Sequence, residues 1–178
     1  MRLLMILGLV FSLSACVQPS LQDPNLPMLN ASIEDNRWQS DIIPLEEVCM
    51  KFNSRPGNAP EIKVSGIPAS AVTIELSFND IDARDSKFNH GGHGVIHYTL
   101  PSSGASEVVI PSFPGQTRQL PDGFSVKRSH VSSWDSYGNG GYLPPCSSGR
   151  GYRYTVDIRA LDAQGKRLSA TKLSLGMY

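Results

Sequence analysis

Two stretches in which apolar and polar side chains alternate strictly constrain the fold of this chain more than any other feature. Ala71–Asn79 reads AVTIELSFN, and Gly151–Ala160 places Tyr152, Tyr154, Val156 and Ile158 on one face. Because successive side chains of a β-strand point to opposite faces, this period of two predicts half-buried strands. We therefore expect a sheet with one face on a core.

Shorter segments extend the same pattern. Val95–Leu100, Glu107–Ile110 and Leu168–Leu175 are further predicted strands, and Gly and Pro punctuate the stretches between them. No segment carries a convincing helical stripe, although Asp41–Met50 has room for one short helix. Charged residues make up only 18% of the chain, with 16 Gly and 13 Pro, a composition typical of strands and turns. We predict a mainly β protein.

Length and charge exclude some classes of protein. The chain has 178 residues, which is enough for one ordinary domain. It carries 16 basic and 16 acidic residues, without the basic excess by which nucleic-acid-binding domains contact phosphates. We therefore expect no nucleic-acid partner.

The N-terminus has the features of an export signal. Arg2 is followed by an apolar run, Leu3–Leu13, which is too short to span a bilayer. The sequence Leu13-Ser14-Ala15-Cys16 at its end resembles the bacterial lipobox, in which the Cys thiol receives diacylglycerol, the chain is cleaved before it, and its new amine is acylated, typically with palmitate. The alternative is an ordinary signal peptide with an unrelated Cys.

These features predict the organisation of the chain. Residues 1–15 are a lipoprotein signal peptide, residues 16–36 are the lipidated N-terminus and a flexible tether, and residues 37–178 are the folded domain. The lipid on Cys16 makes a membrane the first expected partner. Val17 stands where an Asp would signal retention in the inner membrane. We therefore expect a bacterial cell-envelope protein, anchored to the periplasmic face of the outer membrane rather than to the inner membrane.

Several segments of the body match, in order and spacing, the motifs S-P-x-L-x-W-x-x-x-P, D-P-D-A-P, H-W, G-Y-x-G-P-C-P-P with H-R-Y, and A-L-D. The matching segments are Ala59–Ala69, Asp80–Arg84, His97–Tyr98, Gly141–Cys146 with Tyr152–Tyr154, and Ala160–Asp162. From about Ile43 to the C-terminus, the chain thus resembles the phosphatidylethanolamine-binding proteins (the PEBP family), and in particular their bacterial Raf-kinase-inhibitor-like branch.

The resemblance implies a fold and a site. The fold is a large antiparallel sheet packed on a smaller one, with few short helices and a small pocket at one end that takes phosphate, acetate or a phospholipid headgroup. The pocket residues it implies are Asp80, His97 and Tyr154, with Tyr142, Pro144, Pro145 and Tyr152 at the rim. An imidazole that donates to an anionic oxygen, oriented by a carboxylate, gives this assignment a physical basis.

The chain also departs from the family pattern. Ile81 and Arg84 replace the two prolines of D-P-D-A-P, Tyr152 replaces the His of H-R-Y, and Pro144 replaces a glycine. Proline has a fixed φ and no N–H, so Pro144 does not reproduce a glycine that lets backbone approach a ligand. The last two prolines of the family's loop are Ser147 and Ser148 here, and we expect their hydroxyls to supply replacement donors.

Two cysteines remain once Cys16 is lipidated. In an oxidising compartment two thiols usually pair, and the resemblance implies that Cys49 and Cys146 lie close together beside the pocket. We predict a disulfide between them. The alternative is two separate buried thiols.

Other functions remain open. His90, His93 and His97 lie near Asp80 and Asp85, a composition that can bind zinc, but the glycines among them favour a solvated loop. The chain has no G-x-S-x-G motif, P-loop or dinucleotide fingerprint. We predict a non-catalytic protein, without metal or cofactor, that binds a small anion. One alternative is a structural or regulatory lipoprotein with a vestigial pocket that acts through a protein partner, and another is an enzyme that uses the His cluster. Trp134 and Tyr137 are candidates for the mouth of the pocket.

Overall fold

The larger of the sheets contains the segments with the clearest alternation. The computed structural model describes residues 25–38, 40–132 and 140–178. Within them, five strands form an antiparallel sheet in the order β10-β9-β4-β5-β8. Their bounds are Thr73–Asp80 for β4, Val95–Thr99 for β5, Phe124–Arg128 for β8, Arg153–Leu161 for β9 and Arg167–Met177 for β10.

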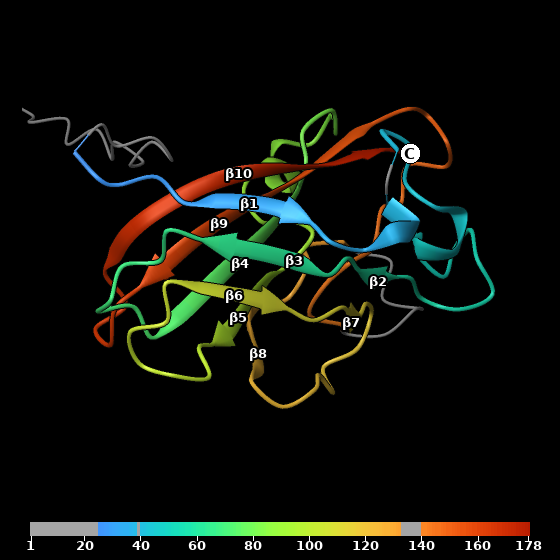
Figure 1. Cartoon of the computed structure of the whole chain (residues 1–178). Helices are drawn as coiled ribbons and strands as arrows, with labels where there is room; N and C mark the ends of the chain where they lie inside the picture. The colour runs from blue at the N-terminus through green and yellow to red at the C-terminus, as the bar shows by residue number, and fades with distance from the viewer. Residues whose placement is uncertain (1–24, 39, 133–139) are drawn as a thin grey trace, which may run out of the picture.

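Two smaller antiparallel sheets complete the described strands. Asn30–Ile33 (β1), Ile62–Ser65 (β3) and Glu107–Ile110 (β6) form one, in the order β1-β3-β6. Asn58–Ala59 (β2) pairs with Phe113–Pro114 (β7) in the other. Figure 1 shows β1, β3 and β6 lying across the large sheet. The helices of the described residues are short 3-10 turns, namely Asn36–Trp38 (η1), Leu45–Glu47 (η2) and Ser86–Asn89 (η3).

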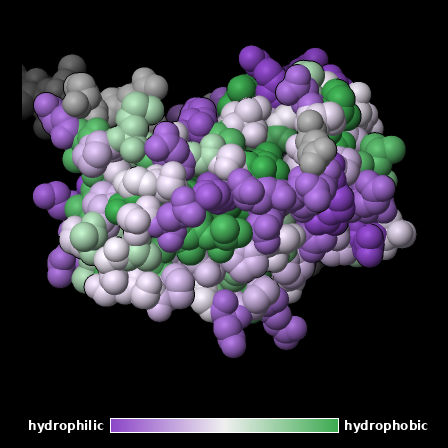
Figure 2. Space-filling model, in the orientation of Figure 1, coloured by the Kyte–Doolittle hydropathy of each residue, from purple (hydrophilic) through white to green (hydrophobic). Residues whose placement is uncertain are grey.

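The hydrophobic core lies between the large sheet and the β1-β3-β6 sheet. On β4, Ile74, Leu76 and Phe78 are buried and belong to one core cluster with Ile62 and Val64 of β3. The alternation in both strands points one set of side chains at the opposite sheet, as the period of two requires. On the outer face of the small sheet, Lys63 and Glu107 form an ion pair at 3.0 Å. Figure 2, which has the orientation of Figure 1, shows hydrophilic residues around small hydrophobic spots on that face.

The predicted mainly β class is confirmed. The five predicted strands correspond to β4, β5, β6, β9 and β10; β6 has the predicted bounds, and the others differ by one or two residues at one or both ends. Within Asp41–Met50, where the sequence allowed one short helix, the structure has the single 3-10 turn η2. Residues 30–33 differ from the prediction, which assigned them to the tether: they form β1, because Asn30–Ile33 pairs with Ser65–Ile62 of β3. Four residues were too few for their alternation to stand out beside the prolines that precede them.

The predicted disulfide is confirmed. Cys49 and Cys146 are bonded, with their Cα atoms 5.3 Å apart and 97 residues between them in sequence. The amide of Cys49 also donates to the carbonyl oxygen of Pro145 at 3.0 Å. The loop before β9 is therefore held to the segment after η2 by a covalent bond and a hydrogen bond.

Antiparallel pairing brings two long loops to one end of the large sheet, where β4 finishes and β5 and β9 begin. β4 ends at Asp80, β5 begins at Val95 and β9 begins at Arg153, and these three strands are neighbours. The loop over residues 81–94 and the loop before β9 therefore start or finish at this same end of the sheet. In the described residues, no helix is long and apolar enough to cross a membrane.

Candidate functional site

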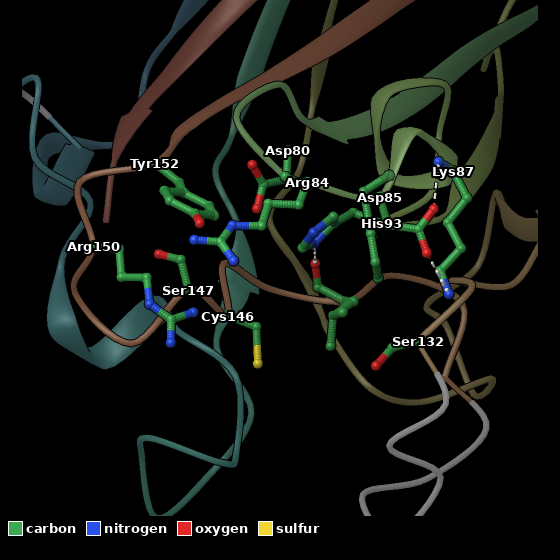
Figure 3. Close-up of a pocket in the computed structure, with 13 residues that line it drawn as sticks. Asp80, Arg84, Asp85, Lys87, His93, Ser132, Cys146, Ser147, Arg150 and Tyr152 are labelled. Atoms are coloured by element: carbon green, nitrogen blue, oxygen red, sulfur yellow. Dashed lines mark hydrogen bonds and ion pairs between the residues drawn. The ribbon is translucent and has the colours of Figure 1, made fainter.

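A cavity of about 420 Å³ lies between these two loops. One wall comes from the end of β4 and the loop with η3, and the other comes from the residues that precede β9 (Figure 3). The lining residues are Asp80, Ala83, Arg84, Asp85, Lys87, Phe88, His93, Ser132, Leu143, Cys146, Ser147, Arg150 and Tyr152. Charged and polar side chains from both loops thus face one space.

Asp80, the last residue of β4, is a buried carboxylate in this wall. Its side chain accepts a hydrogen bond from the amide of Asp82 at 3.1 Å, and Tyr154 is its neighbour on β9. Burial raises the pKa of Asp80, because the penalty on the charged form exceeds the opposite effects of the Asp82 amide and the Tyr154 hydroxyl. Asp80 is therefore a better proton acceptor than an exposed carboxylate.

The neighbouring carboxylate, Asp82, has a different role. Its oxygens accept from the Arg153 amide at 2.8 Å and from the Arg153 guanidinium at 2.6 Å and 2.9 Å. The hydrogen bonds from the Arg153 side chain and amide lower the pKa of Asp82 to about 2. This pair joins the loop after β4 to the start of β9, and so fixes the Asp80 side of the cavity.

His93 lies at the other end of the loop and is buried. Its Nδ1 lies 2.9 Å from the carbonyl oxygen of Leu143, and its ring packs between Phe88 and Tyr154, with centroids 5.4 Å and 5.3 Å away. Burial lowers the pKa of His93 to about 4, so the ring is neutral at neutral pH. Because a carbonyl oxygen only accepts, Nδ1 carries the hydrogen and Nε2 is an acceptor.

Three cationic side chains border the same cavity. Lys87 is paired with Asp85, its Nζ lying 2.9 Å from the carboxylate. Arg84 and Arg150 are exposed, and neither has an ion-pair or hydrogen-bond partner among the described residues. In Figure 3, Arg84 extends from one loop toward the other, which carries Arg150. Two arginines without partners leave the mouth of the cavity electropositive.

The loop before β9 is braced from behind. The hydroxyl of Tyr154 accepts from the amide of Cys146 at 3.1 Å, and the hydroxyl of Ser147 donates to the carbonyl oxygen of Tyr178. The Tyr152 amide also donates to the Tyr178 carbonyl oxygen at 2.9 Å. The predicted role of Ser147 as a donor to a ligand is therefore not what its hydroxyl does here, and Ser148 is exposed outside the cavity lining.

Some of the predicted site residues line the cavity, and others lie elsewhere in the structure. Asp80 and Tyr152 line the cavity, and Tyr154 is the register partner of Asp80 on β9. Tyr142 is instead a core residue, with its ring centroid 4.4 Å from that of Phe78. Pro144 and Pro145 are buried and do not line the cavity. Their loop turns them toward the body of the domain, where Pro144 packs against Gly115.

His97 lies on the other face of the large sheet from Asp80, which corrects its predicted place in the pocket. In the register of β4 with β5, His97 is opposite Glu75, whereas Asp80 shares its face with the core residues. The Nε2 of His97 lies 3.0 Å from Glu75, which also accepts from Arg159 at 2.9 Å. The histidine of the cavity is His93, which sequence reasoning had assigned to a solvated loop.

One signal in the sequence points to the residues that were missed. Because the strands predicted at 71–79, 95–100 and 151–160 are antiparallel neighbours in the structure, the segment after the first and the segments before the other two lie at one end of the sheet, and these segments contain Arg84, Lys87, His93 and Arg150. Within the described ranges, no three His, Cys, Asp or Glu side chains gather as a metal ion requires. Cys16, Trp134 and Tyr137 lie outside the described residues.

Comparison of the sequence with protein-family models and with curated proteins finds no match.

Proposed function

We propose that this protein is a lipid-anchored lipoprotein of the bacterial cell envelope whose domain binds a small anion, such as phosphate or a phosphorylated headgroup, without catalysing a reaction. The observation that carries the proposal is that two guanidinium groups, Arg84 and Arg150, lie at the mouth of a cavity of about 420 Å³ and have no partner among the described residues. A guanidinium group presents donors in a planar fork that matches the oxygens of a phosphate or carboxylate.

The cavity is also a preformed concavity. Its polar groups come from two loops. The Cys49–Cys146 disulfide anchors the loop before β9 to the segment after η2, and the Asp82–Arg153 pair joins the loop after β4 to the start of β9. Small-molecule sites combine such a preformed concavity with a few fixed polar groups. An anion between Arg84 and Arg150 would relieve the repulsion between two like charges, and this favours binding over an empty cavity.

The family resemblance supports the same function. We propose that the chain is a divergent PEBP-like protein, since a larger antiparallel sheet, a smaller sheet and a pocket at one edge are what the resemblance implies. In this proposal His93 takes the place that the resemblance assigned to His97. Arg84, which departs from the family motif, supplies positive charge that a proline would not.

Export and lipidation are supported by the lipobox-like sequence and by the disulfide. Two of the three cysteines are paired, which is typical of proteins in oxidising compartments. The third, Cys16, stands where lipidation is expected. Mass spectrometry of the membrane-extracted chain should find an N-terminus at Cys16 that carries diacylglycerol and an acyl chain. Normal processing and membrane retention of Cys16→Ser would exclude the lipoprotein assignment.

The anion site is tested by calorimetric titration of the purified full chain with inorganic phosphate. Arg84→Gln and Arg150→Gln should each weaken binding by about tenfold, the equivalent of one charge-assisted hydrogen bond. Lys166→Gln is the matched control, because Lys166 is an exposed cation in the turn between β9 and β10, at the opposite end of the sheet. Equal binding by all three variants and the parent would show that phosphate binds elsewhere.

A further inference from the structure

The cavity combines cationic donors with two buried acceptors, and this combination restricts the anions that fit. Arg84 and Arg150 are exposed at the mouth and can only donate hydrogen bonds. Asp80 and His93 also line the cavity but are only 5% and 4% exposed. An anion drawn in by the arginines therefore meets a carboxylate and an imidazole in the wall.

Both buried groups present lone pairs. The hydrogen of His93 is on Nδ1, which donates to Leu143, so Nε2 remains an acceptor, and it has no hydrogen-bond partner among the described residues. Asp80 accepts a hydrogen bond from the Asp82 amide, and an ionised carboxylate has room for about four such bonds. Neither group can satisfy an anion that has only lone pairs to offer.

We propose that the cavity selects oxyanions that carry at least one hydrogen, such as hydrogen phosphate, over oxyanions that carry none, such as sulfate, and that Asp80 makes this selection. The inference deepens the proposed anion-binding function and rests on it. The ligand's hydrogen donates to the Asp80 carboxylate while its other oxygens accept from the arginines. Sulfate would place its lone pairs against a buried carboxylate.

The energetics favour this discrimination. A hydrogen bond to a charged acceptor is stronger than a neutral one, and a buried acceptor that loses its donor keeps its full desolvation cost. Sites that are built to hydrogen-bond a ligand group reject the analogue that lacks it by more than an apolar pocket can. The raised pKa of Asp80 acts in the same direction, because it makes the carboxylate a stronger acceptor for a shared proton.

Calorimetric titration of the full chain at neutral pH with phosphate and with sulfate tests the proposal, since the two anions have nearly the same size and shape. Phosphate should bind at least about tenfold more tightly than sulfate, which corresponds to about 1.4 kcal/mol. In Asp80→Asn, the amide keeps an oxygen for the Asp82 amide but adds a donor toward the cavity. This variant should gain sulfate affinity, so that the ratio falls to about one.

Asp122→Asn is the matched control. Asp122 is exposed in the turn before β8, next to Gly123, whose carbonyl oxygen accepts from Thr99 at the end of β5 far from the cavity. The same chemical change there should leave the ratio as in the parent. Equal affinity of the parent for sulfate and phosphate overturns the selection by a hydrogen, as does an unchanged ratio in Asp80→Asn. Failure to bind either anion overturns the proposed function itself. If Asp80→Asn does not fold, the comparison of phosphate with sulfate on the parent still tests whether the cavity selects an anion that carries a hydrogen.

Discussion

His93 and His97 show how strongly the chemistry of one residue type depends on its surroundings. His93 is buried among Phe88, Tyr154 and the Leu143 carbonyl, whereas His97 is half-buried beside Glu75 on the other face of the sheet. The sequence shows two histidines four residues apart in a Gly-rich and apolar stretch. Which one faces the cavity depends on strand register and on the end of the loop, and neither follows from the residues alone.

The burial of His93 predicts a pH-dependent stability. Because its folded pKa of about 4 lies below the ordinary value of 6.5, the unfolded chain binds more protons between these values. Stability from this residue is fully present above about pH 6.5 and is lost as the pH falls toward 4, by an amount on the order of 3 kcal/mol. Urea unfolding between pH 7 and pH 4 should show this loss in the parent.

The variant His93→Asn isolates that contribution. Its amide can keep the donor to Leu143 but does not titrate, so its free energy of unfolding should fall less steeply with acid than that of the parent. His90→Asn, which changes an exposed neighbour, should follow the parent curve. If the parent and His93→Asn have the same pH dependence, His93 is not held neutral by burial.

At the scale of elements, the alternation predicted the central strands but not how the loops pack. β4, β5 and β9 each contribute one apolar face to the core, and their period of two is visible in the sequence. The short strands β1, β2, β3, β7 and β8 were not predicted, because segments of two to five residues carry little periodicity. The glycines of the loop over 81–94 predict a solvated loop. In the structure the glycines let this loop pack closely against its neighbours, and Gly91, Gly92 and Gly94 are buried.

Gly94 gives a test of that close packing. Its φ is +113°, and a Cβ there would lie 2.1 Å from the carbonyl oxygen of Gly141, in the loop before β9. Gly94→Ala should therefore lower the free energy of unfolding by about 3 kcal/mol or more. Gly104→Ala is the matched control, since Gly104 has a φ of +78° but nothing within 4 Å of its added Cβ.

The difference between the two variants separates steric overlap from backbone strain. Gly104→Ala should cost only about 1 kcal/mol, the price of a left-handed conformation for alanine. Both free energies can be measured by urea unfolding. Equal destabilisation by the two substitutions would mean that the two loops do not approach each other at Gly94 as the structure has them.

At the scale of the molecule, one covalent bond anchors the loop before β9, which forms one wall of the cavity, to the segment after η2. The Cys49–Cys146 disulfide closes a loop with a sequence separation of 97 residues, and Cys146 lines the cavity. The pairing was predicted from a family resemblance and from the compartment, because spacing alone leaves the partners of three cysteines open. The architecture of two packed sheets was expected from the same resemblance. The cationic residues of the cavity match no residue of that family's motifs, so the resemblance did not indicate them.

Removal of the disulfide should loosen both the fold and the site. In the chain-entropy model, a loop of this length contributes about 4–5 kcal/mol to stability. Cys49→Ser with Cys146→Ser should lose stability of this order in urea unfolding and should bind phosphate more weakly. Reductant should destabilise the parent but leave the double variant unchanged. A parent whose unfolding does not respond to reductant, and whose thiols react with an alkylating agent without it, would contradict the disulfide.

The most direct test of an anion site in this cavity is an NMR titration of the full chain with inorganic phosphate, with the backbone amides of both loops assigned. We expect saturable shifts at Arg84, His93, Ser147 and Arg150, and none in the turn at Lys166. Saturation should come below about 10 mM, which corresponds to a binding free energy of about 3 kcal/mol. The absence of any saturable shift around the cavity at that concentration, or shifts of equal size at Lys166, would contradict the account.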